Sequence, residues 1–593
     1  KIYNLESKSK KNLISPILYD WSPVFCPSGK YIYFLGIREF HPIYNETHFE
    51  LGFPYASRPY IVILSREDKS PLDSCLEIYE ENEEEDDKKK TPITKIDYQD
   101  IESRVLPVPI RLGGYIDLIP TKNKLLYLKE KTTTPNPATK VEYGDDNLYQ
   151  FSFKTLKEEL FHDKIDDYSL STNNDYILLR THEKLRLIST DEKPNDEDDT
   201  GLFNKKDGWI DMTPISIKID PRKEWKQIYQ EAWILQREHF WNKQMSSINW
   251  KNIYLKYLPL VEKINTRSEF SDLLWEMQGE LGTSHCYEFE GDYHKLPNHE
   301  PLGQLGAKLE FNPKDKSYKI IHIHKGNSWD TNTASPLSNH HVQLNNGDKI
   351  IDLDGEKFQS SNDIYALLDN KGNKKISLLI KQKSSKTTKR IYTKTLPNQM
   401  PLLYRAWVEK NRNIVHKKTN GKIGYVHIPD MSTFGFAEFY RSFLSESGKD
   451  GLIIDVRFNG GGNVSQHILK ILTQKTLGYD FSRWGATEKF PTYSTKSKIT
   501  CITNEMAGSD GDIFSHSFKM LKLGKLIGKR TWGGVIGIWP RNELNDGTIT
   551  TQPEYSFWFN DVGYNIENKG TEPDIEVEIT PQDWSNNIDT QLD

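Results

Sequence analysis

The sequence is poor in cysteine and gives no sign of cysteine-based chemistry. Its four cysteines, Cys26, Cys75, Cys286 and Cys501, lie far apart and form no Cys-x-x-Cys pair. This spacing argues against both a zinc site and a disulfide framework. We therefore expect free thiols in a reducing, cytoplasmic compartment.

Long apolar runs and an excess of one charge are also missing. No apolar run reaches the roughly 18 residues of a membrane-spanning helix, and the first ten residues are polar and charged. Neither a membrane anchor nor a secretion signal is expected. The formal net charge of -6 provides no basic surface for nucleic acid or an anionic membrane. Peptides or small neutral partners fit this composition better.

What the chain has is length and enough apolar residues to fill several cores. At 593 residues it is too long for one core, and roughly 150 residues per domain predicts three to five units. It begins at Lys1 rather than Met, as a piece of a longer protein would.

Residues 1–218 are expected to form an all-β region of propeller-like blades. From Trp21 to about Ile217, short runs rich in Tyr, Ile and Leu alternate with turn-type sequences. A blade needs about 40 to 50 residues, so we expect four or five blades. A closed propeller is expected to need sequence upstream of Lys1. The acidic and then basic run Glu80–Lys90 is interpreted as a solvated loop insertion.

The hydrophobic period changes near Pro221. Apolar residues in Trp225–Leu235 recur three and four apart, which predicts an amphipathic helix. Helices are expected to continue to about Leu281, within a helical segment that spans 219–297.

Strand patterns return after that segment. The stretch Asn346–Gly355 resembles the Gly-Asp, strand and Asp-Gly turn pattern of PDZ domains. Ser361–Leu368 would be the helix of such a domain and Lys375–Lys381 its last strand. We therefore expect a PDZ-like β domain at 298–398.

Residues 399–593 alternate predicted strands and helices, which indicates α/β layering. The predicted strands are Ile423–Ile428, Leu452–Phe458 and Ile499–Thr503, and the predicted helices are Ala437–Leu444, Val464–Leu472 and Ile513–Leu521.

Ser509 lies between the last of these strands and the last of these helices. A helix N-terminus offers free N–H groups and a positive dipole end, which stabilise an anion forming beside a hydroxyl. A serine at this position is also a common helix N-cap. The local sequence leaves both interpretations open.

The segment Asp455–Gly462 runs from a buried-type strand into three glycines. In an acyl-transfer enzyme such a loop can direct a backbone N–H at the oxyanion of the tetrahedral intermediate. A phosphate-binding loop is disfavoured because no Gly-Lys-Ser/Thr follows. A tight strand-to-helix turn remains an alternative.

A reactive serine needs a base, and His285 in Gly282–His285 is the best candidate among the 16 histidines. Its small, hydroxylic neighbours leave room at the imidazole, and Ser284 could position it, although a structural or surface histidine is the common alternative. His516 is the local rival, but its separation from Ser509 corresponds to about 10 Å along a helix, too far for a hydrogen bond.

The imidazole also needs a carboxylate to orient it. Glu567 is the candidate, and Glu572 and Asp574 compete with it. No spacing argument separates the three.

Four segments together resemble the signature segments of the tricorn protease family: Gly282–His285, Asp455–Gly462, Ala507–Asp512 and Glu567–Gly570. The order of regions is similar as well. The family has a β-propeller, a helical C1 segment, a PDZ-like domain and an α/β C2 segment of the crotonase and tail-specific protease type.

By matching position, the resemblance implies a Ser-His-Ser-Glu tetrad. Ser509 would be the nucleophile and His285 the general base. Ser284 and Glu567 would form the relay that orients the imidazole.

The resemblance also implies how substrate is held. The backbone N–H groups of Gly462 and Asp510 would form the oxyanion hole, with the choice among the three glycines left open. Asp480 would favour basic P1 side chains. Ile538 would form an apolar wall of the S1 pocket, although core packing is the alternative for it.

Membership would imply a cytosolic serine endopeptidase or oligopeptidase that trims peptides released by larger proteases. It would work through an acyl-enzyme without metal or cofactor and assemble as a homo-oligomer, a hexamer. Family chains carry a second propeller ahead of this region that this sequence does not include, so entry control and assembly are the implied properties that the sequence supports least.

Two other functions remain as alternatives. One is a non-catalytic propeller–PDZ adaptor that binds peptides by strand addition. The other is a Ser-Lys protease of the tail-specific type. The second is disfavoured because Thr531–Val535, where its lysine is expected, contains none, although Lys525, Lys529 and Arg530 lie nearby.

Overall fold

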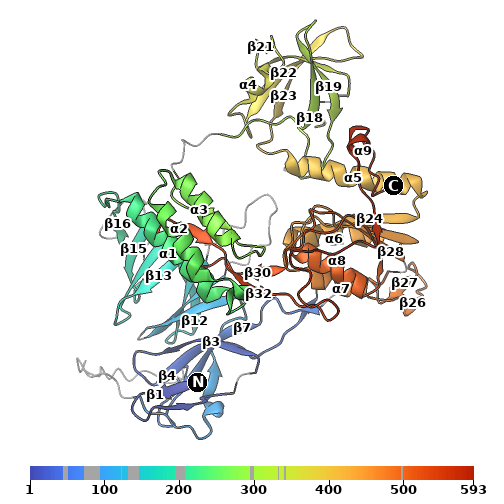
Figure 1. The fold of residues 1–593 in the computed structure, drawn as a ribbon. Helices are drawn as coiled ribbons and strands as arrows, with labels where there is room; N and C mark the ends of the chain where they lie inside the picture. The colour runs from blue at the N-terminus through green and yellow to red at the C-terminus, as the bar shows by residue number, and fades with distance from the viewer. Residues whose placement is uncertain are drawn as a thin grey trace. The chain divides into compact units, whose positions relative to one another are not determined.

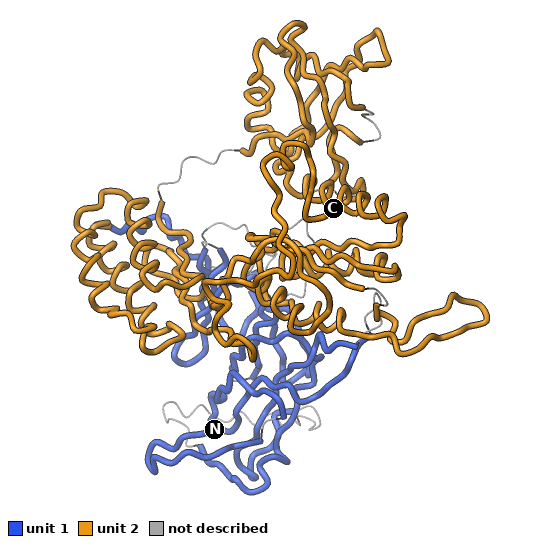
Figure 2. The backbone as a smooth tube through the Cα atoms, turned by 45° about the vertical axis from the view of Figure 1, so that its right-hand side comes forward, with its two compact units in different colours: residues 1–218 blue, residues 219–593 orange. Residues whose placement is uncertain are grey.

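The protein divides into two compact units, residues 1–218 and 219–593 (Figure 2). The computed structural model describes residues 1–15, 17–44, 51–72, 94–121, 123–130, 146–182, 184–194, 203, 207–293, 300–330, 333–339, 342, 344–495 and 498–593. The Glu80–Lys90 run and Cys75 lie outside these ranges. The other three cysteines are buried free thiols.

The first unit consists mainly of four-stranded antiparallel sheets (Figure 1). The sheets are β3 (Tyr19–Phe25), β4 (Tyr31–Ile37), β7 (Ser57–Ile63) and β8 (Val105–Pro107); β9 (Tyr115–Pro120), β10 (Lys124–Lys129), β11 (Asp146–Ser152) and β12 (Lys157–Ile165); and β13 (Asp167–Leu170), β14 (Tyr176–Thr181), β15 (Lys184–Ser189) and β16 (Trp209–Ile210). Two short ribbons accompany them, β1 (Ile2–Asn4) with β2 (Ser9–Lys11) and β5 (Ile43–Tyr44) with β6 (Leu51–Gly52). Such sheets are the blades of a propeller-like region.

Strand β10 explains how neighbouring blades share cores. Its side chains alternate between two faces, as in any strand. Leu125 and Tyr127 belong to the apolar cluster shared with the first blade, whereas Leu126 and Leu128 belong to the cluster shared with the third. The central blade is therefore buried on both faces.

The described residues contain three four-stranded blades, so the expected number of four or five is wrong for this part of the chain. The connections from β7 to β8 and from β10 to β11 include 73–93 and 131–145. Each of these blades therefore uses more chain than the average used for the prediction.

The second unit begins with three helices, where the amphipathic pattern predicts them: α1 (Pro221–His239), α2 (Trp250–Val261) and α3 (Arg267–Gly279). Trp225, Ile228, Tyr229 and Ala232 are all buried on one face of α1. They join a cluster with apolar residues of α2 and α3, which forms a separate small core.

A β domain with one short helix follows. Its sheet has the order β18 (Ala307–Asn312), β19 (Ser317–Ile323), β20 (Lys349–Leu353), β22 (Lys375–Lys381) and β23 (Thr388–Lys394). Strand β21 (Glu356–Lys357) pairs with β20 through the predicted Asp-Gly turn, and α4 (Asp363–Leu368) is the predicted helix. The domain has its own apolar core.

The rest of the unit is built on a parallel sheet. Its order is β24 (Ile423–His427), β25 (Gly451–Asp455), β28 (Lys498–Thr503), β29 (Gly524–Gly528) and β33 (Ile575–Glu576). The helices of this region are α5 (Met400–Lys418), α6 (Thr433–Glu446), α7 (Ser465–Leu472) and α8 (Asp510–Met520).

Helices cover both faces of the parallel sheet, as such sheets require. Leu452 and Ile454 of β25 belong to the apolar cluster of α6, α7 and α8, while Ile453 packs into the cluster of α5. Because β25 and β28 are parallel neighbours, they end at the same edge of the sheet, where the glycine loop and Ser509 follow.

Smaller elements complete the second unit. They are β17 (Glu288–Glu290) paired with β31 (Thr548–Thr550), β26 (Gly478–Asp480) with β27 (Glu488–Phe490), β30 (Ile536–Ile538) with β32 (Pro553–Ser556), and α9 (Pro581–Ser585). In the described ranges, no helix combines the length and apolar character needed to cross a bilayer. The predicted multidomain fold class is confirmed.

Candidate active site

Ser509 lies at the turn between β28 and α8 in an unusual backbone conformation. Its φ is 58° and its ψ is -121°, outside the regions that non-glycine residues favour. Its side chain makes no capping hydrogen bond to α8. The hydroxyl is therefore directed elsewhere, and the N-cap interpretation does not account for it.

A hydrogen-bonded chain of four side chains connects Ser509 to Glu567. The Ser509 Oγ lies 3.2 Å from His285 Nε2, and His285 Nδ1 lies 2.8 Å from Ser284 Oγ. The Ser284 hydroxyl donates to Glu567 Oε2 at 3.1 Å. Because the Ser284 proton is used there, its oxygen accepts from Nδ1–H, which leaves His285 Nε2 unprotonated beside Ser509.

Glu567 is held by donors from two segments. Oε1 accepts the Ser284 N–H at 2.7 Å and the Thr283 hydroxyl at 3.1 Å. Oε2 accepts the Val535 N–H at 2.7 Å in addition to the Ser284 hydroxyl. The carboxylate is thus fixed and its lone pairs are well satisfied.

His285 is buried and also held through its main chain. The Thr551 hydroxyl donates to its carbonyl oxygen at 2.5 Å, and the rings of Tyr287 and Trp532 each lie 5.5 Å from its ring. Burial lowers the pKa of His285 below its usual 6.5, and Glu567 opposes this shift. The imidazole is therefore neutral at neutral pH, as a general base must be.

The glycine loop presents one free N–H. The Gly460 N–H donates to the Pro429 carbonyl at 3.0 Å and the Gly461 N–H to Asn459 Oδ1 at 3.0 Å. Within the described part of the chain, the Gly462 N–H has no such partner, and neither has the N–H of Asp510 at the start of α8.

The glycine loop also lies directly against the serine. A Cβ on Gly461 would stand only 2.5 Å from the Cβ of Ser509. No larger residue fits there, because a Cβ that close would overlap the serine side chain.

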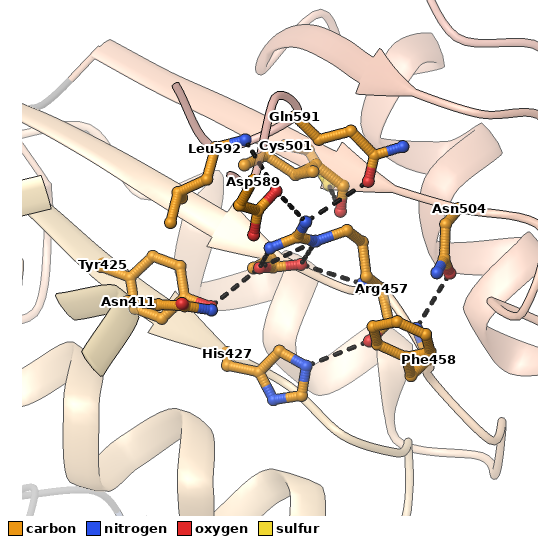
Figure 3. Close-up of polar contacts among 12 residues, drawn as sticks. Asn411, Tyr425, His427, Arg457, Phe458, Cys501, Asn504, Asp589, Gln591 and Leu592 are labelled. Carbon is orange, nitrogen blue, oxygen red and sulfur yellow. Dashed lines mark hydrogen bonds and ion pairs between the residues drawn. The ribbon is translucent and has the colours of Figure 1, made fainter. Parts of the chain in front are cut away.

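A buried ion network supports the base of this loop (Figure 3). The Arg457 guanidinium pairs with Asp455 and Asp589, each at 2.7 Å, and Gln591 Oε1 lies 3.3 Å away. The adjacent Phe458 N–H donates to Asn504 Oδ1 at 2.9 Å. The sequence hints at such a network only through two charged residues in an otherwise apolar strand.

Two buried residues connect the glycine loop to the turn of Ser509. The Asn459 carbonyl accepts the Gly508 N–H at 3.0 Å. The Asp510 carboxylate accepts the Ser465 N–H at 2.9 Å, and burial raises its pKa. The sequence alone assigns no role to the Asn459 carbonyl or to the Asp510 carboxylate, although both residues lie in the quoted motifs.

Asp480 lies apart from the four-residue chain. It is exposed at the end of β26, opposite Glu488 of β27, in a two-stranded ribbon separate from the parallel sheet (Figure 1). Among the described residues, no hydrogen bond or ion pair connects it to Ser509 or His285. Ile538 is half-buried in β30, three residues after Val535.

The rival residues are engaged in other interactions. His516 lies 3.0 Å from Asp561. Asp574 accepts the Leu526 N–H at 2.8 Å, and Glu572 lies 3.8 Å from Arg530.

The position of Lys529 does not favour the Ser-Lys protease alternative either. The Lys529 ammonium pairs with Glu576 at 2.7 Å, so it is not poised to act on Ser509. Within the described ranges, no group of three or more His, Cys, Asp or Glu side chains is arranged to hold a metal ion.

Comparison with family models gives the class of this site. Residues 422–577 match Peptidase family S41, so the segment that carries the glycine loop, Ser509 and Glu567 is a peptidase domain of that family. Three further models match in order along the chain. They are the tricorn protease second beta propeller domain at 1–191, the tricorn protease C1 domain at 221–279 and the tricorn protease PDZ domain at 303–398.

Whole-chain comparisons agree with these matches. A tricorn protease homolog of Saccharolobus solfataricus is 41% identical over 100% of this chain and 53% of its own length. The tricorn protease of Thermoplasma volcanium is 34% identical over 100% of this chain and 55% of its own. A crystal structure of the tricorn protease superposes with a TM-score of 0.88 at 33% identity, covering 100% of this chain and 55% of that one.

The chain belongs to the tricorn protease family. It spans little more than half the length of these relatives.

Proposed function

We propose that the protein is a serine peptidase that cleaves oligopeptides through an acyl-enzyme. The observation that carries this proposal is the continuous hydrogen-bonded chain from Ser509 through His285 and Ser284 to Glu567. A serine, an unprotonated imidazole nitrogen and a carboxylate in this order are what nucleophilic acyl transfer requires.

In the first step Ser509 Oγ attacks the carbonyl carbon of the scissile bond while His285 Nε2 takes its proton. The resulting imidazolium is stabilised through Ser284 by the carboxylate of Glu567. His285 then protonates the leaving amine, and the peptide bond breaks to give an ester on Ser509.

The negative oxygen of the tetrahedral intermediate needs donors that are not already in use. We assign this role to the N–H groups of Gly462 and Asp510. Among the described residues these two N–H groups have no other partner, which supports the assignment and favours Gly462 over Gly460 and Gly461. One such donor typically contributes about 3 kcal/mol to transition-state stabilisation.

In the second half of the reaction water attacks the ester, and His285 again acts as base. The free acid leaves and Ser509 regains its proton. Substrate binding is assigned to Asp480, which would favour Lys or Arg at P1, and to Ile538, which would form an apolar wall beside P1. As part of the same proposal, the peptidase acts in the cytoplasm and assembles as a homo-oligomer.

We further assign four domains: propeller blades at 1–218, the helical C1 segment at 219–297, the PDZ-like domain at 298–398 and the C2 segment at 399–593. Separate apolar cores in the last three regions support these boundaries.

Replacing Ser509 by Ala tests the central assignment. We expect peptide hydrolysis to fall on the order of a thousandfold or more, because only binding and the oxyanion donors remain. A fluorophosphonate should label the wild type at Ser509 and leave Ser509→Ala unlabelled.

Ser515→Ala is the matched control. Ser515 is buried in the same helix, and its hydroxyl donates to the Gly511 carbonyl at 2.8 Å. This variant should keep its activity. Near-normal hydrolysis by Ser509→Ala would refute the proposal, and tight peptide binding without labelling or cleavage would favour the adaptor.

A further inference from the structure

Asp512 is a buried carboxylate one turn beyond Ser509 that the proposed reaction does not use. Its side chain is 0% exposed. Oδ1 accepts the Gly533 N–H at 2.8 Å and the Thr531 hydroxyl, and Oδ2 accepts the Gly534 N–H at 3.1 Å. Asp512 therefore attaches the first turn of α8 to the segment Thr531–Val535.

This segment touches two members of the four-residue chain. The ring of Trp532 lies 5.5 Å from that of His285. Three residues later, the Val535 N–H donates to Glu567 Oε2 at 2.7 Å. The position of the segment thus affects both the base and the carboxylate that orients it.

The Thr531 hydroxyl extends the attachment to the segment that follows Glu567. While it donates to Asp512, it accepts the Thr571 N–H at 2.7 Å. The Gly533 carbonyl accepts the Asn568 N–H at 2.7 Å. Two hydrogen bonds from the residues that follow Glu567 therefore connect that segment, through Thr531–Val535, to the Asp512 carboxylate.

Burying the Asp512 carboxylate costs free energy of desolvation, which a residue that only packs in the core would not incur. In the described part of the chain it forms no ion pair, and its partners are neutral hydroxyl and backbone N–H groups. Burial raises its pKa to about 6, although these donors and the Ser509 N–H lower it. An apolar or amide side chain would avoid this desolvation, so the presence of a carboxylate here indicates a functional demand.

We propose that Asp512 is a positioning residue that fixes Thr531–Val535, and through it His285 and Glu567, relative to Ser509. This inference rests on the proposed function. Its effect is geometric, because Asp512 touches neither substrate nor the reacting atoms. Losing it should loosen the alignment needed for proton transfer while leaving substrate contacts unchanged.

Asp512→Asn tests this role because it keeps the shape of the side chain. One oxygen becomes an NH₂ group that faces backbone N–H donors, so at least one attachment is lost. We expect kcat to fall at least tenfold with KM within twofold, and the rate of fluorophosphonate labelling to fall in parallel. Asp561→Asn is the matched control, since Asp561 also bonds to α8 but through His516.

A second pair of variants keeps the test decisive if Asp512→Asn folds poorly. Thr531→Val removes the hydroxyl without changing the shape, and Thr531→Ser restores it. We expect Thr531→Val to lower kcat at least fivefold and Thr531→Ser to recover most of it, with melting temperatures that differ by only a few degrees.

The outcomes separate this inference from the proposed function. If the wild type neither cleaves peptides nor reacts with the fluorophosphonate, the proposed function fails and this inference falls with it. If the wild type is active and both Asp512→Asn and Thr531→Val keep kcat within twofold, the positioning role alone is refuted. A loss that Thr531→Ser does not recover, or that follows the folded fraction, would also refute it.

Discussion

Ser509 and Asp480 differ in the number of chain segments that form hydrogen bonds around them. Hydrogen bonds join Ser509, the adjacent Gly508 and their partners to four segments, at 282–285, 459–462, 531–535 and 567–571. Asp480 lies in a ribbon whose two strands, among the residues that the structure describes, pair with each other and with no third strand. Large apolar side chains of that ribbon are exposed, Phe481 at 81% and Trp484 at 88%.

This contrast predicts how far the effect of a substitution should extend in each of the two regions. Around Ser509 each polar group has several partners, so one substitution disturbs groups that it does not touch and effects should be non-additive. On the β26–β27 ribbon a substitution should act only through its own side chain. The two regions should therefore respond differently in rate, in stability and in substrate choice.

The largest effect is expected from Glu567→Gln. Each carboxylate oxygen accepts two donors, so the amide NH₂ must face a donor pair in either orientation. We expect kcat to fall on the order of 100-fold or more, because Ser284 and His285 lose their orientation. Steady-state hydrolysis of a fluorogenic peptide measures this.

Glu572→Gln is the control for that variant, because Glu572 lies five residues further on with a side chain 75% exposed. It should change kcat by less than twofold. Equal losses of kcat in the two variants would mean that Glu567 matters no more for catalysis than the exposed Glu572.

A smaller effect is expected on stability, through the pH dependence that Asp512 adds. Its pKa is raised from 3.8 to about 6 in the folded protein, so the folded state binds this proton more tightly than the unfolded state. Local stability should therefore fall as pH rises from about 4 to about 6, by about 3 kcal/mol for a shift of roughly two pKa units.

Hydrogen exchange of the α8 amides, corrected for the intrinsic pH effect, measures this dependence. Asp512→Asn should remove it, leaving only the part due to other groups. An identical pH dependence in the variant and the wild type would show that Asp512 is not the group responsible.

The smallest effect is expected from Asp480→Asn, and it should be selective. Loss of the carboxylate should slow cleavage after Lys or Arg by about tenfold, with little change after Leu or Phe. Glu488→Gln, opposite on the same ribbon, is the matched control. Equal losses for all P1 residues, or equal selectivity in both variants, would reject the role of Asp480 and weaken the contrast between the two regions.

The sequence predicts much of this fold because periodicity is local. The strand predicted at Lys375–Lys381 has the bounds of β22, but it is not the last of the PDZ-like domain, because β23 follows and pairs with it. The helix predicted at Val464–Leu472 begins one residue early. The predicted strand Leu452–Phe458 runs three residues past the end of β25. The conformation of those residues, Val456 to Phe458, depends on tertiary contacts, which the hydrophobic periodicity of the sequence does not reveal.

The candidate site was less predictable because its contacts are not local. His285 lies 224 residues from Ser509, and Ser284 lies 283 from Glu567. Spacing could not choose between Glu567 and Asp574, whereas their hydrogen bonds distinguish them at once. The partners of Asp512 were equally hidden, since neutral threonines and glycines carry no charge pattern that would reveal them.

The pairing of β17 with β31 has a practical consequence for this arrangement. Ser284 and His285 precede the β domain of β18 to β23, and Ser509 and Glu567 follow it. A single cut within that domain would leave each fragment with half of the four-residue chain and one strand of the β17–β31 pair. Given the proposed peptidase activity, the two fragments, fused to a pair of interacting proteins, would form a split-enzyme reporter in which recovered peptide cleavage shows that the two proteins bind each other.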